Sequence, residues 1–278
     1  MSEPLNILVT LNSNYVKPLR VMLYSLFLNN KGEQFTVYVM HSSLKRQEIE
    51  GLRRLCAEQG NGSMLEEIEV DDHSFAAAPT LLHYTKEMYY RLLAFRFLPD
   101  PMERILYLDP DILVLNSVRE LYETDLEHYL YAAASHDLIS IKEINKLRLN
   151  PYKIESYYNS GVLLMNLKLQ KKLVSEEEIY DFVENNRTKL IMPDQDIINA
   201  LYAKRIKNID EKLYNYDARY FRYYKITSNG EWDMEYVINH TVFLHFCGKR
   251  KPWKKDYSGK FHALYKYMER LCDATNSH

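Results

Sequence analysis

Hydrophobic runs alternate with amphipathic stretches along the first seventy residues. Residues 5–10, 35–40 and 64–70 form short hydrophobic or alternating runs that predict strands. Residues 18–29 and 44–59 place hydrophobic side chains at helical spacing, and each stretch ends in Asn and Gly residues typical of helix ends. This β-α-β-α-β order predicts a parallel sheet with right-handed crossovers.

The rest of the chain continues the pattern. Further strands are expected at 105–108, 112–115, 129–134, 162–167 and 241–246. Further helices are expected at 85–97, 116–122, 175–186 and 192–199. Residues 256–278 are basic and aromatic with a helical period, so we expect one α/β domain over residues 1–255 and a small C-terminal helical extension over residues 256–278.

Two aspartates interrupt the most hydrophobic part of this pattern. Asp109 and Asp111 lie one residue apart between two hydrophobic runs. Buried carboxylates are costly unless they are paired or hold a metal. Two acids at positions i and i+2 of an extended backbone point to the same side, where both reach one Mn²⁺ or Mg²⁺ ion and leave positions for substrate phosphates. The alternative is an ordinary turn or helix N-cap.

The position of these acids supports a ligand site. Ligands of open α/β sheets bind beyond the carboxyl ends of the strands, where the pair Asp109 and Asp111 and the polar loop 12–15 both fall. The loop after the first strand has no Gly-x-Gly-x-x-Gly or Gly-Lys-Ser/Thr motif, which argues against a dinucleotide enzyme or a P-loop NTPase. A metal ion with basic side chains is the other way to hold a diphosphate.

Three further residues are candidates, each with a structural alternative. Arg91 lies on the expected helix 85–97, where a solvated charge is the alternative. Asp194 opens the expected helix 192–199, and local evidence favours it as the N-cap of that helix. His245 lies in a hydrophobic strand, either as a core histidine or as a third metal ligand. Gly248 and a basic cluster follow it, which suits a turn that faces phosphate.

Composition narrows the class of protein. A formal net charge of -2 gives no support for nucleic-acid binding. Three cysteines without zinc spacing indicate a reducing compartment. The start of the chain predicts no signal peptide, and no hydrophobic run predicts a membrane span. Residues 249–270 interleave basic and aromatic side chains, so this segment either docks on the domain or touches an anionic membrane or the acceptor.

Six blocks of the sequence together resemble glycosyltransferase family 8, the retaining GT-A enzymes that include bacterial lipooligosaccharide galactosyltransferases and glycogenin. The resemblance covers about residues 5–255 in family order. Its blocks are Thr10-Leu11-Asn12-Ser13-Asn14-Tyr15, Tyr90-Arg91-Leu92, Leu108-Asp109-Pro110-Asp111, Asn159-Ser160-Gly161-Val162, Asp194-Gln195-Asp196 and His245-Phe246-Cys247-Gly248 with Lys251-Pro252-Trp253. It implies a Rossmann-like GT-A domain with a mixed, mostly parallel sheet.

The resemblance also implies residue roles. Asp109, Asp111 and His245 would bind Mn²⁺, with Mg²⁺ as the alternative. Donor-binding residues would be Thr10, Asn12, Asn14, Tyr15, Arg91, Pro110, Asn159, Ser160, Gly248 and Lys251. Some family members have Asp where this chain has Asn12, and relatives often have a small residue where it has Pro110, which lacks an N–H for the ribose.

The implied reaction is transfer of a hexose from UDP-glucose or UDP-galactose to a glycan, glycolipid or glycoprotein acceptor. With two acids committed to metal, the acid and nucleophile pair of a glycosidase is disfavoured. Same-face substitution, with Gln195 steadying the sugar cation, is the preferred mechanism, and double displacement through Asp194 is the alternative. A cytoplasmic bacterial enzyme of cell-surface polysaccharide synthesis is expected, with residues 249–270 as a candidate contact with the inner face of the membrane.

Two other functions remain open from the sequence. One is a catalytically inactive nucleotide-sugar-binding protein on the same fold, and donor turnover separates it from an enzyme. The other is a metal-dependent nucleotidyltransferase. That class would have a glycine-rich, basic nucleotide loop near the N-terminus, and residues 11–15 do not form one.

Overall fold

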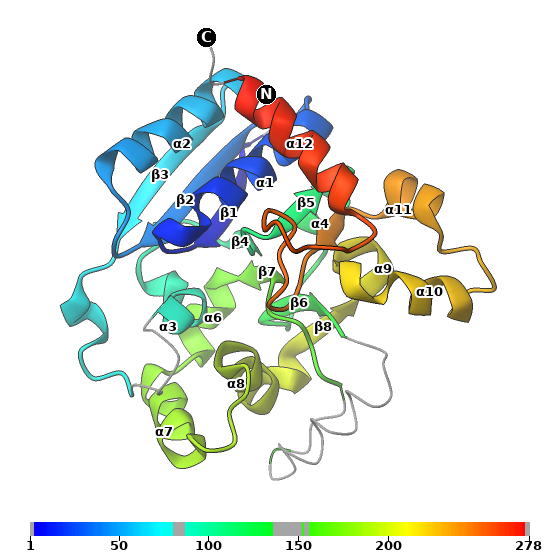
Figure 1. Ribbon diagram of the computed structural model, residues 1–278. Coiled ribbons are helices and arrows are strands. Elements are labelled where there is room, and N and C mark those ends of the chain that lie inside the picture. Colours follow the sequence, from blue (N-terminus) through cyan, green and yellow to red (C-terminus); the bar gives the residue numbers. More distant parts are fainter. Residues whose placement is uncertain (1–2, 80–86, 136–151, 153–155, 276–278) are drawn as a thin grey trace.

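A seven-stranded sheet forms the centre of the computed structural model, which describes residues 3–79, 87–135, 152 and 156–275 (Figure 1). The strand order is β3-β2-β1-β4-β7-β6-β8. The strands are β1 (Leu5–Thr10), β2 (Phe35–His41), β3 (Met64–Glu69), β4 (Arg104–Leu108), β6 (Tyr131–Ala134), β7 (Val162–Asn166) and β8 (Ile206–Ile209). Of these described strands, β7 alone runs antiparallel to its neighbours. The predicted mixed, mostly parallel sheet is confirmed.

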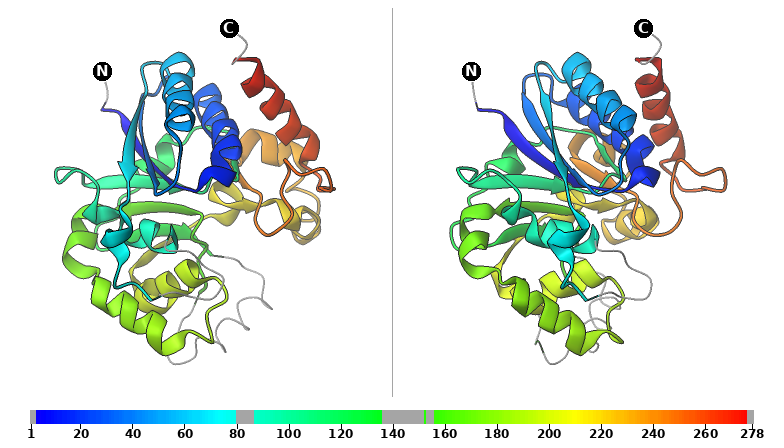
Figure 2. Two further views of the ribbon diagram at one scale, coloured as in Figure 1. Left: turned by 60° about the vertical axis from the view of Figure 1, so that its left-hand side comes forward. Right: turned by 90° about the vertical axis from the view of Figure 1, so that its left-hand side faces the viewer.

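Helices cover both faces of this sheet (Figures 1 and 2). Side chains alternate along β1, so Ile7 and Val9 pack with the helices of one face and Leu8 packs with those of the other. The first face carries α1 (Val16–Asn29) and α2 (Arg46–Gln59). The second carries α3 (Glu87–Leu93), α6 (Leu167–Leu173), α7 (Glu176–Asn186) and α8 (Pro193–Tyr202). The result is a three-layer α/β/α arrangement.

Shorter elements complete the fold. The helix expected at 116–122 forms only over Arg119–Tyr122, and the helix expected at 85–97 also differs from its observed form. The helix expected at 85–97 ends at Leu93 and continues as a 3₁₀ turn, while residues 85 and 86 lie outside the described part. The remaining short helices are α4 (Arg119–Tyr122), α9 (Glu211–Tyr214), α10 (Phe221–Thr227) and α11 (Met234–His240). The 3₁₀ turns are η1 (Ser13–Tyr15), η2 (Asp72–Phe75), η3 (Ala94–Arg96), η5 (Ala203–Arg205) and η6 (Ala218–Tyr220).

A second, three-stranded sheet brings the C-terminal part of the chain to the main sheet. β5 (Ile112–Val114) pairs antiparallel with β10 (Phe243–His245), and β10 pairs parallel with β9 (Tyr216–Asp217). This register sets His245 opposite Ile112, one residue after Asp111. The small sheet thereby places a histidine from the end of the chain beside the aspartates from its middle.

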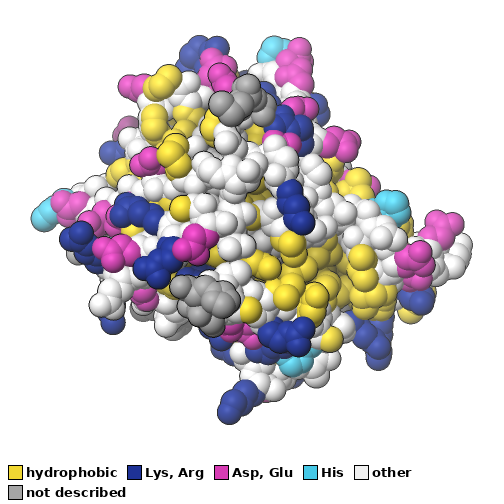
Figure 3. Space-filling view, turned by 90° about the horizontal axis from the view of Figure 1, so that it is seen from above, with side chains coloured by type: hydrophobic (Ala, Val, Ile, Leu, Met, Phe, Trp, Pro, Cys, Tyr) yellow, Lys and Arg dark blue, Asp and Glu magenta, His cyan; other side chains and the backbone are white. Residues whose placement is uncertain are grey.

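The C-terminal helix α12 (His262–Ala274) docks on α1, as one of the two readings of this segment predicted (Figure 1). Tyr265 and Met268 are buried in the same cluster as Val21 of α1. The outer face of α12 leaves Tyr267 and Arg270 exposed. Seen from this end, hydrophobic side chains form a continuous area on one side of the molecule, beside scattered charges of both signs (Figure 3). In the described part of the chain, no helix has the length and hydrophobicity that crossing a membrane requires.

Candidate active site

A cavity of about 520 Å³ opens at the carboxyl ends of β1 and β4. Because β7 runs antiparallel to β4, the residues that lead into β7 lie at the same edge. The cavity is lined by Thr10, Leu11, Asn12, Tyr15, Met88, Arg91, Asp109, Pro110, Asp111, Asn159, Ser160, Gly161, Met192, Asp194, Gln195, His245, Cys247, Gly248 and Lys251. Every site residue expected from the sequence is in this set except Asn14.

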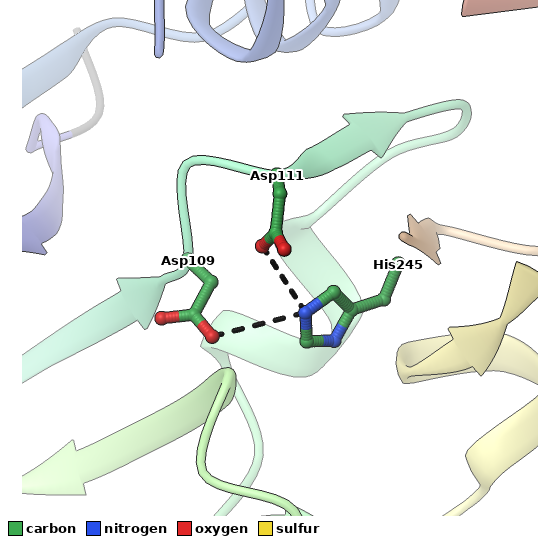
Figure 4. Close-up of side chains that lie close together, drawn as sticks. All are labelled: Asp109, Asp111 and His245. Atoms are coloured by element: carbon green, nitrogen blue, oxygen red, sulfur yellow. Dashed lines mark ion pairs between the residues drawn. The ribbon is translucent and has the colours of Figure 1, made fainter. Parts of the chain in front are cut away.

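Two carboxylates and one imidazole converge in this cavity. Asp109 follows β4, Asp111 precedes β5 and His245 ends β10, so three strands hold the cluster (Figure 4). Nε2 of His245 lies 3.2 Å from Oδ1 of Asp111 and 3.7 Å from Oδ2 of Asp109. One ligand atom from each residue lies within 4.8 Å of the others, so the cluster could hold a metal ion.

The spacing of the cluster fits a divalent cation. Two ligand atoms at a right angle on an ion, each at about 2.1 Å, are about 3.0 Å apart, close to the observed 3.2 Å separation. Carboxylate oxygens with one imidazole nitrogen form a donor set that suits Mn²⁺ or Mg²⁺ better than a thiophilic metal. Both aspartates lie in the turn between β4 and β5, with Asp109 partly exposed and Asp111 buried.

Asn215 fixes the orientation of the histidine. The Oδ1 atom of Asn215 lies 2.8 Å from Nδ1 of His245, and both side chains are buried. An amide oxygen can only accept, so Nδ1 of a neutral His245 carries the proton and Nε2 keeps a lone pair toward the aspartates. This is the outer partner that metal-binding histidines commonly have.

Gly161 makes room for the cluster. A β-carbon built on this residue would come within 3.0 Å of both His245 and Asp109, closer than real β-carbons approach other atoms. The backbone of Gly161 also holds the site together, because its carbonyl accepts a hydrogen bond from the N–H of Asp109 at 2.8 Å. Its own N–H donates to Oδ1 of Asn159 at 2.7 Å.

Arg91, from α3, joins the two acidic sides of the cavity. Its guanidinium lies 3.0 Å from Oδ1 of Asp109 and 3.0 Å from Oδ2 of Asp194. It also stacks 4.5 Å above the ring of Tyr107 and donates to the carbonyl of Ser160 at 3.1 Å. The alternative of a solvated helix charge is wrong, because Arg91 faces the cavity and bridges two carboxylates.

The start of α8 supplies Asp194 and Gln195. The N-cap of α8 is Met192, so the interpretation of Asp194 as a helix cap is wrong. Its carboxylate instead accepts a hydrogen bond from Oγ of Ser160 at 2.9 Å and pairs with Arg91. Gln195 is buried, and its Oε1 atom accepts long hydrogen bonds, of 3.4 Å from the N–H of Ser160 and 3.5 Å from Nδ2 of Asn159.

Lys251 places a second cation beside the aspartates. Its ammonium contacts the carboxylate of Asp111 and donates to the carbonyl of Phe246 at 2.9 Å. Burial opposes both charges, but the attraction outweighs it: the pKa of Lys251 is raised, and His245 and Lys251 together lower the pKa of Asp111. For His245, burial is outweighed by Cys247 and Asp111, and its pKa rises well above the ordinary value. The surroundings of His245 and Lys251 thus favour their protonated forms.

The loop after β1 also lines the cavity. Asn12 caps η1 by accepting a hydrogen bond from the N–H of Asn14 at 3.1 Å. Asn14 itself is exposed and does not line the cavity, so the structure places it apart from the other expected donor residues. The ring of Tyr15 packs edge-on against Trp253, with 5.8 Å between ring centroids. This contact joins the first loop to the turn that carries Lys251.

Sequence reasoning missed two residues that support the site. Tyr107 donates a hydrogen bond to Oδ1 of Asp109 at 2.6 Å and lies 3.2 Å from the hydroxyl of Thr10. Its position two residues before Asp109 in an extended strand was a usable signal, because such side chains share a face. Asn215 lies thirty residues before His245 and carries no local pattern, so no sequence signal would have found it.

The chain belongs to glycosyl transferase family 8, whose model matches residues 6–257. A lipopolysaccharide 1,2-glucosyltransferase of Escherichia coli is 29% identical over 257 residues, which cover 90% of this chain and 74% of that protein. A lipopolysaccharide 1,3-galactosyltransferase of Salmonella typhimurium is 22% identical and covers 91% of this chain and 74% of its own length. The expected family is therefore confirmed.

Solved structures support the fold. The crystal structure of the galactosyltransferase LgtC in complex with donor and acceptor sugar analogues matches with a TM-score of 0.79 and 22% identity, covering 96% of both chains. The glycosyltransferase GlyE of Streptococcus pneumoniae matches with a TM-score of 0.73 and 18% identity, covering 99% of this chain and 64% of that one. The fold of this chain is therefore the mixed α/β GT-A fold.

Proposed function

We propose that this protein transfers glucose or galactose from a UDP-hexose to a glycan or glycolipid acceptor, with retention of the anomeric configuration. The observation that carries the proposal is the convergence of Asp109, Asp111 and His245 in a cavity that also holds Arg91 and Lys251. Two carboxylates, an imidazole and two cations suit a metal-bound diphosphate. The names of the related glucosyltransferase and galactosyltransferase support a hexose donor.

The metal in this proposal is Mn²⁺, with Mg²⁺ as the alternative, and Asp109, Asp111 and His245 are its protein ligands. When bound, it would supply positive charge that stabilises the departing diphosphate. Lys251 would add a fixed cation on the same side. The backbone at Gly248 has a φ of +84°, a conformation that favours glycine, and this turn lines the cavity.

The first loop would hold the nucleotide. Thr10, Asn12 and Tyr15 line the cavity from the end of β1 and the loop after it, where a uridine would have hydroxyl and amide partners and an aromatic ring. Pro110 also lines the cavity and has no N–H to donate, so ribose contacts there would come from other groups. Asn159, Ser160 and Arg91 line the part of the cavity nearer α8, which we assign to the donor sugar.

The chemistry follows from the groups that face this sugar subsite. The Asp194 carboxylate already engages Arg91 and Ser160, and both contacts use its Oδ2 atom. That arrangement makes it a weaker nucleophile than a free carboxylate, so double displacement remains the second choice. Gln195 would steady the sugar cation through its amide oxygen while the acceptor hydroxyl attacks from the face that the diphosphate leaves. The departing phosphate oxygen would take the acceptor proton.

The names of related proteins support a proposal for the acceptor, and exposed side chains support a proposal for the cellular location. Lipopolysaccharide is a glycolipid, and two related proteins are named as lipopolysaccharide glycosyltransferases, which supports a glycolipid acceptor. The exposed side chains of Lys254, Lys255, Tyr267 and Arg270 offer the basic and aromatic character that anionic membrane surfaces bind. We therefore propose a cytoplasmic enzyme with peripheral contact at the inner face of the membrane through residues 249–270.

UDP release from a panel of UDP-sugars, with and without Mn²⁺, tests the proposal. The expected result is slow, Mn²⁺-dependent hydrolysis of UDP-glucose or UDP-galactose that is lost in Asp111→Asn. Asp256→Asn is the matched control, because Asp256 is exposed and does not line the cavity. Mn²⁺-dependent UDP binding without release from any donor would favour the second function, a catalytically inactive nucleotide-sugar-binding protein.

A further inference from the structure

A second cavity adjoins the first. Its volume is about 380 Å³, within the usual range of about 300–1,000 Å³ for small-ligand sites. It lies between the segment 218–222 and the chain that joins β10 to α12, and Cys247 and Gly248 line both cavities. A molecule that enters the first cavity beside this shared turn can therefore extend into the second.

The second cavity is strongly basic. Five of its lining side chains are cationic, and no lining residue is acidic. Arg219 is paired with the buried Asp217 through contacts of 2.6–3.1 Å. The other four are exposed and have no acidic partner among the residues that the structure describes; they are Arg222, Lys249, Arg250 and Lys260. Cations gathered around a hollow without counter-ions indicate an anionic ligand.

The floor of the cavity is aromatic. Phe246 is buried and Phe221 and Tyr257 are half-buried, and the rings of Phe246 and Tyr257 lie 6.0 Å apart in an edge arrangement. Aromatic rings offer flat hydrophobic faces, whereas the rim offers charge. This pairing fits a sugar that carries a phosphate better than it fits a bare inorganic anion, which would use only the rim.

We propose that this second cavity is an acceptor subsite that binds a phosphate group on a sugar close to the one that receives the hexose. The inference rests on the proposed function, because it takes the first cavity to be the donor site. It extends that function by defining a phosphorylated glycan as the acceptor class. The phosphate lies against Arg222, Arg250 and Lys260, and its sugar lies on the aromatic floor.

Binding of glucose 6-phosphate and of glucose, measured by calorimetry with the donor site saturated by UDP and Mn²⁺, tests the subsite. We expect glucose 6-phosphate to bind the parent at least about tenfold more tightly than glucose. The variant Arg222→Gln/Arg250→Gln/Lys260→Gln should lose about tenfold or more of that affinity. The control Lys254→Gln/Lys255→Gln/Arg270→Gln removes the same charge outside the cavity and should bind as the parent does.

Binding to vesicles that contain phosphatidylglycerol shows whether the second cavity recognises a sugar phosphate or a lipid headgroup. The subsite predicts that the cavity variant binds vesicles as the parent does, because the exposed cations Lys254, Lys255 and Arg270 are unchanged in it. Equal glucose 6-phosphate affinity in the parent and the cavity variant, or equal losses in both variants, would overturn the proposal. So would vesicle binding that depends on the cavity residues while glucose 6-phosphate binds no better than glucose.

The test also separates this inference from the proposed function. None of the three cavity cations lines the donor cavity, so UDP binding should be equal in the parent and the cavity variant. Absence of UDP binding in the parent would contradict the proposed function itself. The comparison of glucose 6-phosphate binding without UDP would still report on the second cavity.

Discussion

A β-carbon on Gly161 would lie 2.3 Å from Cε1 of His245, so this position tolerates only glycine while the histidine keeps its place. Gly161→Ala must therefore displace the imidazole or the neighbouring Asp109. We expect Mn²⁺ affinity, measured by calorimetry, to fall by about tenfold or more. Gly32→Ala is the control, because a β-carbon there meets nothing within 4 Å. An unchanged Mn²⁺ affinity in Gly161→Ala would contradict metal binding by Asp109, Asp111 and His245.

Arg91 holds two carboxylates together, so its loss should destabilise the fold as well as the site. Arg91→Met leaves Asp109 and Asp194 without their shared cation, and we expect a loss of about 2 kcal/mol in the free energy of unfolding by urea. Arg91→Lys should recover only part of this loss, because an ammonium cannot reach both acids as a guanidinium does.

Arg96→Met is the matched control for Arg91. Arg96 lies five residues later and forms an exposed ion pair with Glu176, which should contribute less than about 1 kcal/mol. Equal losses for Arg91→Met and Arg96→Met would mean that the Arg91 bridge gives no special stability.

Asn215 should act on metal binding through His245. Asn215→Leu removes the acceptor at Nδ1, and we expect Mn²⁺ affinity to fall by about 10–100-fold. Asn215→Asp keeps an acceptor oxygen, and Nδ2 of Asn215 has no hydrogen-bond partner among the described residues, so the exchange forfeits no bond there. The Asp variant should therefore retain most of the affinity. Similar losses in both variants would rule out an orienting role for the amide oxygen.

The ion pair between Glu33 and Arg119 should make stability depend on pH. The hydrogen bond from Arg119 lowers the pKa of Glu33, so the pair stabilises the fold above the unfolded pKa of about 4.3. This contribution is lost as the pH falls through the lower pKa of the folded state. Glu33→Gln should cost about 1 kcal/mol at pH 7 in urea unfolding, and the difference should shrink in acid. A constant difference between pH 7 and pH 3 would contradict this.

Most strands and the pair Asp109 and Asp111 were predictable from the sequence because they follow local rules, whereas β8 and β9 were not expected. Strand β4 is a hydrophobic run that ends at Asp109, and a carboxylate in that setting already requires a partner or a metal. The parallel arrangement of β1, β2 and β3 followed from the β-α-β order. His245 could be proposed from the sequence as a ligand or a core residue, but only the register of β10 with β5 places it beside the aspartates.

Other features could not be predicted because they depend on contacts between distant segments. Local rules favoured Asp194 as a helix cap, yet Arg91 from α3 and Ser160 from the turn before β7 engage its carboxylate instead. The role of Gly161 depends on the space left by His245, eighty-four residues later in the chain. The family resemblance implied that Asn14 binds the donor together with its neighbours. In the structure Asn14 lies in the 3₁₀ turn η1 and does not line the cavity.

UDP binding, measured by calorimetry in the presence and absence of Mn²⁺, tests the proposed metal and diphosphate site most directly. We expect UDP to bind the parent with Mn²⁺ and removal of the metal with a chelator to weaken binding by about tenfold or more. His245→Ala should lose this metal dependence. UDP binding that is equally strong without a divalent cation, or no UDP binding at all, would contradict a metal site that holds the diphosphate of a UDP-hexose.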